Sequence, residues 1–172
     1  MFSKRITKTP GLIIDLFGQL SAYALVLLMA VTALDVFMRY FLNQGSVAFQ
    51  ELEWHLFSAV FLLGSAYTLR CDQHVRVDIF FKSKFCSQRT RKLIDLLGAL
   101  FFLLPFCGVI VWSSGAFVFD AFDYAETSPD PGGLTHRWIV KSLIPLGASL
   151  LCIQGIITCL LYTSPSPRDG LL

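Results

Sequence analysis

The chain has 172 residues, of which 55% are hydrophobic and only 15% are charged, whereas about 25% of the residues in an ordinary soluble domain are charged. A soluble domain of this length cannot enclose so much apolar surface, so the composition indicates one lipid-embedded domain. The net charge is only +2, and no basic patch is interleaved with stacking aromatic residues, which argues against a nucleic-acid-binding protein.

Four apolar runs are long enough to be membrane spans, because a bilayer core is crossed by roughly 20 helical residues. The runs cover residues 16–38, 52–69, 93–119 and 138–161. Backbone polar groups in lipid must bond within their own segment, so we expect all four runs to be helices. The predicted fold class is therefore an all-α integral membrane protein with four transmembrane helices.

The first three runs each have a distinctive feature. The first follows Lys4, Arg5 and Lys8, as in a signal peptide, but it is too long and lacks a small-residue cleavage site, so we expect a retained span. The second run is short, so it can cross the bilayer only if the residues before it extend the helix or if the bilayer is locally thinner. The third contains Pro105, which predicts a tilt or a kink.

The distribution of lysine and arginine predicts the orientation in the membrane. With the N-terminus inside, eleven of the 14 basic residues lie on the inner side and three on the outer side. Seven of the eleven lie in the loop between the second and third runs: Arg70, Arg76, Lys82, Lys84, Arg89, Arg91 and Lys92. Short loops rich in Lys and Arg stay cytoplasmic, so we expect both termini to face the cytoplasm.

Asp35 and Arg39 are the first charged candidates for function. They lie four residues apart with the acid first, a spacing that allows an ion pair along one helix. An unpaired charge at the bilayer centre costs on the order of 3 kcal/mol, and pairing near a helix end reduces that cost. Two interpretations stay open, an interfacial anchor and a polar contact with a partner subunit's helix. A proton relay is disfavoured because no chain of ionisable groups continues the pair.

A second polar cluster lies at the start of the second run. Glu51 and His55 form an i,i+4 pair. Glu51 and Glu53 both lie near the start of the run, where the helix dipole stabilises acidic side chains. Trp54 suits the level of the lipid headgroups. Helix capping with membrane anchoring explains this cluster, and docking to a partner is the alternative.

The fourth run begins with a similar group of residues. We expect Trp138 at the membrane interface, with Arg137 and Lys141 extending outward to the headgroups. The preceding residues 128–133, "SPDPGG", are interpreted as turn residues with no further role.

The loop "RCDQHVRVDIFFKSKFCSQRTRK", residues 70–92, allows three interpretations. Cys71, His74 and Cys86 have uneven spacing for a metal site. A strand is suggested by apolar residues that alternate with polar ones from residue 75 to 79, but a single strand would have no sheet to join.

A helix lying at the membrane surface, from about residue 77, accounts for more of this loop. Three phenylalanines can enter the acyl boundary while basic side chains reach anionic headgroups of membrane lipids. The residues concerned are Phe80, Phe81, Phe85, Arg76, Lys82, Lys84 and Arg89. His74 and Asp78, four residues apart, can stabilise the start of this amphipathic helix; His74 is interpreted as a capping residue or as a specific contact with a partner.

The five cysteines give no sign of enzyme chemistry. They show no C-x-x-C spacing, and three of them lie within the apolar runs, where cysteine behaves as a small hydrophobic residue. Motifs for a nucleophile elbow, a zinc protease or a phosphate-binding loop are also missing from the sequence. We therefore expect no enzyme activity, no metal and no cofactor.

Four motifs together resemble a known family. "LDVFMRY", "FQELEWHLFSAVFLLGSAYTL", "HVRVD" and "GGLTHRWIVKSLIPLG" occur in this order between about residues 20 and 157. This arrangement resembles the small membrane subunit, DctQ-type, of tripartite ATP-independent periplasmic (TRAP) transporters.

The resemblance implies a noncatalytic role in the bacterial inner membrane. Such a subunit braces a large, DctM-type membrane subunit that carries the sodium and solute sites, and it helps to dock a DctP-type periplasmic binding protein that delivers an organic anion, often a carboxylate. By position in the motifs, structural or docking roles fall to Arg39, Glu51, Glu53, Trp54, His74, Val75, Asp78, Trp138 and Lys141.

Two other functions stay open for this sequence. A free-standing four-span channel or assembly factor fits the same topology. A membrane thiol oxidase would need cysteine pairs in the outer loops, and residues 40–53 and 120–137 contain none. We expect one domain over residues 1–162, whereas residues 163–172, "TSPSPRDGLL", resemble no ending of the family, and their prolines cannot continue a helix.

Overall fold

The structure is a computed structural model, and it describes residues 8–71, 73, 93–94 and 96–163. Four long helices form within these residues: α2 (Lys8–Phe41), α3 (Val47–Arg70), α6 (Leu104–Asp123) and α7 (Trp138–Thr163). A short π-helical turn, η1 (Ala99–Leu103), leads directly into α6. The described part of the chain contains no strand, so its fold is all-α as predicted.

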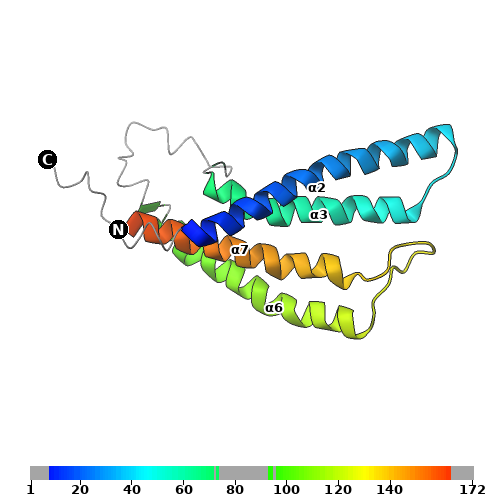
Figure 1. The fold of residues 1–172 in the computed structure, drawn as a ribbon. Coiled ribbons are helices and arrows are strands. Elements are labelled where there is room, and N and C mark those ends of the chain that lie inside the picture. The colour runs from blue at the N-terminus through cyan, green and yellow to red at the C-terminus, as the bar shows by residue number, and fades with distance from the viewer. Residues whose placement is uncertain (1–7, 72, 74–92, 95, 164–172) are drawn as a thin grey trace.

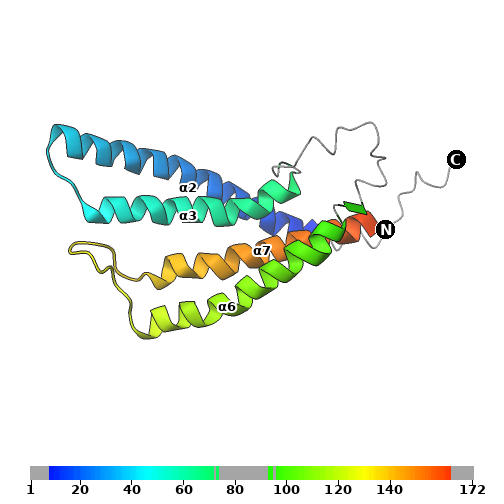
Figure 2. The ribbon, with the colours of Figure 1, turned by 180° about the vertical axis from the view of Figure 1, so that it is seen from behind.

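The four helices form two antiparallel hairpins, α2–α3 and α6–α7 (Figure 1). Helices α3 and α7 pack together and join the hairpins, while α2 and α6 lie on opposite flanks, as the view from behind also shows (Figure 2). Helix α2 makes a smaller contact with α7, near the end where α2 begins. The result is an open array of helices in which α2 and α6 each leave a broad face uncovered.

The short connections lie together at one end of the array. The loops of residues 42–46 and 124–137 define this loop end, whereas α2 begins and α7 ends at the opposite, terminal end (Figure 1). The hairpins diverge toward the loop end. Side chains at the loop end must therefore reach across a gap if they are to connect the hairpins.

The apolar core lies where α2, α3 and α7 meet. Its buried residues are Ile14, Leu63, Ala66, Leu150 and Ile157. Small residues let the helices approach closely elsewhere: a Cβ added to Gly147 on α7 would lie 2.8 Å from the backbone oxygen of Leu62 on α3. Most other large apolar side chains are exposed, as expected for a protein whose surroundings are lipid.

Three helical segments are long and apolar enough to cross a membrane. They are Gly11–Phe41, Leu96–Asp123 and Trp138–Leu160. Helix α2 is longer than its predicted span; its 34 residues extend about 50 Å, so it would tilt or protrude from a hydrocarbon core of about 30 Å. Helix α3 is not among the three, because polar residues at both of its ends leave only a short apolar stretch between them.

Pro105 is accommodated by a local change in helical winding. The backbone N–H of Leu104 bonds to the Ala99 carbonyl, five residues earlier, so a wider turn immediately precedes the proline. Proline has no N–H and its ring collides with the preceding turn of an ordinary α-helix, which a wider turn relieves. A π-helical turn thus directly precedes Pro105, and the tilt or kink expected there stays a prediction.

Candidate functional site

The loop end contains a polar cluster built on Glu51. Residue 51 lies at the start of α3, just outside the predicted span, and its side chain points into the loop of residues 124–137. Its Oε1 accepts a hydrogen bond from the Ser128 hydroxyl, and its Oε2 accepts one from the Leu134 backbone N–H at 2.5 Å. One carboxylate therefore connects the two hairpins across 77 and 83 residues of sequence.

The electrostatics of Glu51 favour its charged form. The Ser128 hydrogen bond, followed by the Leu134 backbone bond, lowers the pKa of Glu51 below its ordinary value of 4.5, and the nearby Arg137 charge acts in the same direction. Hydrogen bonds to the ionised form and opposite charges both stabilise it. Glu51 is thus an anion that binds the loop, and its 5% exposure leaves little of it accessible to a partner.

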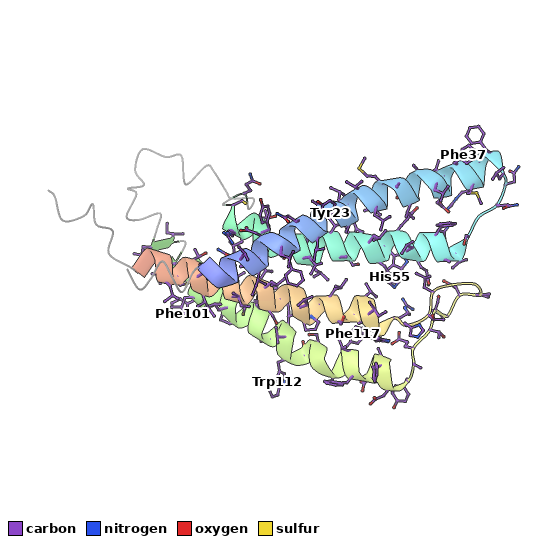
Figure 3. The ribbon with its side chains drawn as sticks, viewed as in Figure 1. Tyr23, Phe37, His55, Phe101, Trp112 and Phe117 are labelled. Carbon is purple, nitrogen blue, oxygen red and sulfur yellow. The ribbon has the colours of Figure 1, made fainter. Side chains whose placement is uncertain are left out.

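The expected pairing of Glu51 with His55 takes a different form. The His55 ring donates from Nδ1 to the backbone carbonyl of Glu51, which leaves the carboxylate free for the loop. Figure 3 shows His55 on the side of α3 that faces α7. Trp54 is half-exposed and its indole ring receives the Arg137 guanidinium at 5.3 Å, a cation–π contact that forms a second link between the hairpins.

Trp138 and Lys141 also contact protein at the loop end. Lys141 forms an ion pair with Glu126, and its Nζ lies 3.9 Å from the centre of the Phe117 ring. Trp138 packs edge-on against Phe122 with ring centres 5.4 Å apart. Arg137 and Lys141 thus contact aromatic and acidic groups of this chain at the loop end, and their predicted extension to the lipid headgroups stays a prediction.

The ion pair of Asp35 with Arg39 is present as the spacing predicted. Asp35 is 3% exposed, and its Oδ1 has no hydrogen-bond partner. With its amide oxygen turned toward the guanidinium, Gln50 on α3 accepts from Arg39 Nη2 at 2.7 Å. The ion pair therefore contributes to the contact between α2 and α3. Glu53 also has a buried oxygen, Oε1, without a partner.

Comparison with known proteins identifies the family. A family model described as the DctQ component of tripartite ATP-independent periplasmic transporters matches residues 28–162. The chain belongs to this family. The resemblance inferred from the four motifs is confirmed.

One relative shows how similar this chain is to a named member of the family. The C4-dicarboxylate TRAP transporter small permease protein DctQ of Rhodobacter capsulatus is 31% identical over 105 residues. The aligned part is 61% of this DctQ chain and 44% of the relative, so the match spans less than half of the relative's length.

Sequence reasoning missed a second polar contact, at the terminal end of this DctQ chain. Arg70, the last residue of α3, pairs with Asp15 on α2 at 3.0 Å and donates to the Gly11 carbonyl. Nearby, the Ser21 hydroxyl donates to the Val60 carbonyl at 2.9 Å. The sequence pointed to Arg70 only as a cytoplasmic charge, because its partner lies 55 residues away.

Sequence reasoning also missed the role of residues 128–133. Interpreting "SPDPGG" as turn residues with no further role was wrong, since Ser128 binds the carboxylate of Glu51. A Cβ added to Gly133 would lie 2.8 Å from Glu51 Oε2, so the glycine lets the backbone approach the carboxylate. The available signal was the acidic Glu51 of the "FQELEW" motif, to which the sequence assigned only a local partner, His55.

Several predicted site residues lie outside the described residues. They are the candidates of the second loop: His74, Arg76, Asp78, Phe80, Phe81, Lys82, Lys84, Phe85 and Arg89. The amphipathic helix predicted there stays a prediction, as do the weaker metal and strand interpretations. Within the part of the chain that the structure describes, no group of three or more His, Cys, Asp or Glu residues could hold a metal ion.

Proposed function

We propose that this DctQ-family protein is the noncatalytic small permease subunit of a sodium-coupled TRAP transporter that takes up carboxylate-type organic anions. The observation that carries this proposal is the match to the DctQ family over residues 28–162. The fold agrees with it: in the described residues, the polar contacts connect helices and loops of this chain, and the uncovered faces of α2 and α6 are apolar. Apolar faces of this kind allow a chain to pack beside another membrane protein within the bilayer.

Two partners follow from this proposal. A DctM-type large membrane subunit would hold the sodium and solute sites, and the present chain would brace it in the bilayer. A DctP-type periplasmic binding protein would deliver the anion and dock in part on the loop of residues 124–137. The name of the Rhodobacter capsulatus relative, which refers to C4-dicarboxylates, supports a carboxylate as the class of solute.

The proposed orientation places the loop end in the periplasm and both termini in the cytoplasm. It is supported by the basic residues, eleven of which then lie inside and three outside. In this orientation α3 also crosses the inner membrane, and its polar ends are stabilised by the loop at Glu51 and by Asp15 at Arg70. We propose that residues 1–162 form one domain and that residues 77–92 lie on the cytoplasmic surface, anchored to lipid.

Reconstitution tests this function. The chain, a DctM-type large subunit and a DctP-type binding protein are placed in vesicles, and uptake of a radiolabelled C4-dicarboxylate is measured with an inward sodium gradient. We expect uptake only when all three proteins and the gradient are present. Uptake by this chain alone would contradict the proposal and favour a free-standing channel, and sodium-independent uptake by the complex would contradict the coupling.

A further inference from the structure

We propose that Glu51 is a positioning residue for docking of the periplasmic binding protein. Its carboxylate holds the loop of residues 124–137 in one conformation, and exposed residues of that loop contact the binding protein. This inference rests on the proposed function. It assigns to Glu51 an indirect role in docking, whereas the sequence left open helix capping with membrane anchoring or direct docking to a partner.

The burial of Glu51 excludes a large direct contact. The residue is 5% exposed, and each carboxylate oxygen already accepts a hydrogen bond from the loop. A docking protein would have to break those bonds to reach the carboxylate, which would leave a partly buried donor unpaired. Glu51 therefore affects a partner through the loop that it binds.

The loop needs such a fixed point because its backbone is strained at both ends. Ala125 has φ 45° and His136 has φ 63°. These are left-handed conformations that residues with a Cβ adopt at a cost of about 1–2 kcal/mol each. Such conformations persist only where surrounding contacts enforce them.

Contacts within the loop determine only part of its shape. The backbone N–H of Ser128 bonds to the Leu134 carbonyl at 3.0 Å, so these two residues close a small ring. Glu51 binds the same two residues from α3, which attaches that ring to the other hairpin. Removing the carboxylate would leave the ring closed but no longer attached at this point to α3.

The attached ring presents a defined exposed surface. Its exposed residues include Asp130 and Pro131 at the turn, with Thr135 and His136 beside them. The Thr135 hydroxyl lies 2.8 Å from His136 Nδ1, which orients the imidazole. A carboxylate, a rigid proline and an oriented imidazole on one loop form a surface that a folded protein can recognise, provided that the loop keeps its position.

Two measurements on the reconstituted three-protein complex test this inference. The first is hydrogen exchange of residues 124–137, and the second is uptake as a function of binding-protein concentration. We expect Glu51→Ala to raise exchange in this loop and to raise the half-saturating concentration of binding protein about tenfold, with the maximal rate unchanged. Glu51→Gln, which keeps an acceptor for the Leu134 N–H, should show a smaller effect.

Two further variants distinguish residues that position the loop from residues that contact the binding protein. His136→Ala should weaken docking without raising exchange elsewhere in the loop, because it removes a contact residue. Gln44→Ala, an exposed side chain in the other loop of the same end, is the control and should change neither measurement. Co-purification of each variant with the large subunit confirms that it has folded.

Distinct outcomes overturn distinct parts of the inference. Unchanged exchange in Glu51→Ala would show that the carboxylate does not hold the loop. Raised exchange with an unchanged half-saturating concentration would show that the loop does not take part in docking, while the proposed function would stand. Uptake by the unmodified complex that needs no binding protein would instead refute the proposed function.

Discussion

At the residue scale, the pH response of Glu51 follows from its hydrogen bonds. The Ser128 and Leu134 donors lower its pKa, so the stabilisation of the loop is present above the ordinary value of 4.5 and is lost as pH falls through the lower pKa of the folded state. A mildly acidic medium therefore leaves the loop attached.

The first prediction is that the Leu134 amide stays protected from hydrogen exchange between about pH 8 and about pH 5 and loses protection only in stronger acid. Protection factors, which correct for the intrinsic pH dependence of exchange, are the measurement. Glu51→Gln is the control and should give a flat, lower profile. Loss of protection near pH 6 would contradict the assigned ionisation.

At the element scale, the glycines of the helices separate into two kinds. Gly147 on α7 and Gly64 on α3 each have a neighbouring helix so close that a Cβ would lie within 3 Å of one of its atoms. Gly108 and Gly115 on α6 have nothing within 4 Å of a built Cβ. Close contacts between helices of this chain explain why glycine occurs at positions 147 and 64. No contact within the described residues explains the glycines at positions 108 and 115.

The second prediction concerns the contact between α3 and α7. Gly147→Ala should destabilise the isolated chain by about 2 kcal/mol, because the new methyl group meets a backbone oxygen that cannot move without its helix. Gly108→Ala is the matched control and should be neutral or slightly stabilising, since alanine favours a helix over glycine. Unfolding of both variants in mixed detergent micelles measures the difference, and equal stabilities would refute the close packing.

The third prediction concerns the uncovered face of α6. Gly108 and Gly115 flank Trp112, which is 89% exposed and points away from the array (Figure 3). An indole N–H near the middle of a span has no acceptor in lipid, so a protein neighbour suits it better. We expect Gly108→Leu to reduce co-purification with the large subunit several-fold without affecting the stability of the isolated chain.

The control for this third prediction is Ala30→Leu, an exposed position on α2, the opposite flank. If Gly108→Leu leaves co-purification unchanged while Ala30→Leu reduces it, then α2, and not α6, faces the large subunit. Such a result would assign another face to the contact and leave the family membership intact.

At the scale of the whole molecule, the array is open and has one loop end and one terminal end. Links between its hairpins at the loop end are polar, whereas the core where α2, α3 and α7 meet is apolar. This arrangement suits a loop end in water and a core in lipid, and the excess of basic residues supports the proposal that the terminal end is cytoplasmic.

The fourth prediction tests that orientation with a membrane-impermeant thiol reagent. In a variant without other cysteines, Gly45→Cys at the loop end should be labelled in spheroplasts. A chain that keeps only its exposed native Cys71, at the end of α3, should be labelled only after the membrane is opened. The reverse pattern would show that the termini face the periplasm.

Much of the fold was predictable because it is encoded locally. Long apolar runs specify helices in lipid through their own backbone hydrogen bonds, and the Asp35–Arg39 pair follows from spacing along one helix. The location of Pro105 predicted a tilt or a kink, whereas the structure shows a π-helical turn directly before it, which the sequence did not predict. Four motifs in the right order were enough to identify the family.

Only the tertiary structure decided how those parts meet. Glu51 accepts hydrogen bonds from Ser128 and Leu134, and Arg70 forms an ion pair with Asp15, although tens of residues separate the partners in the sequence. Such pairings depend on which helices become neighbours and how far the hairpins diverge, and no local pattern encodes these distances. The sequence by itself therefore determined the membrane class, the helices and the family. The packing decided that an acidic residue at a helix start would hold the loop of the other hairpin.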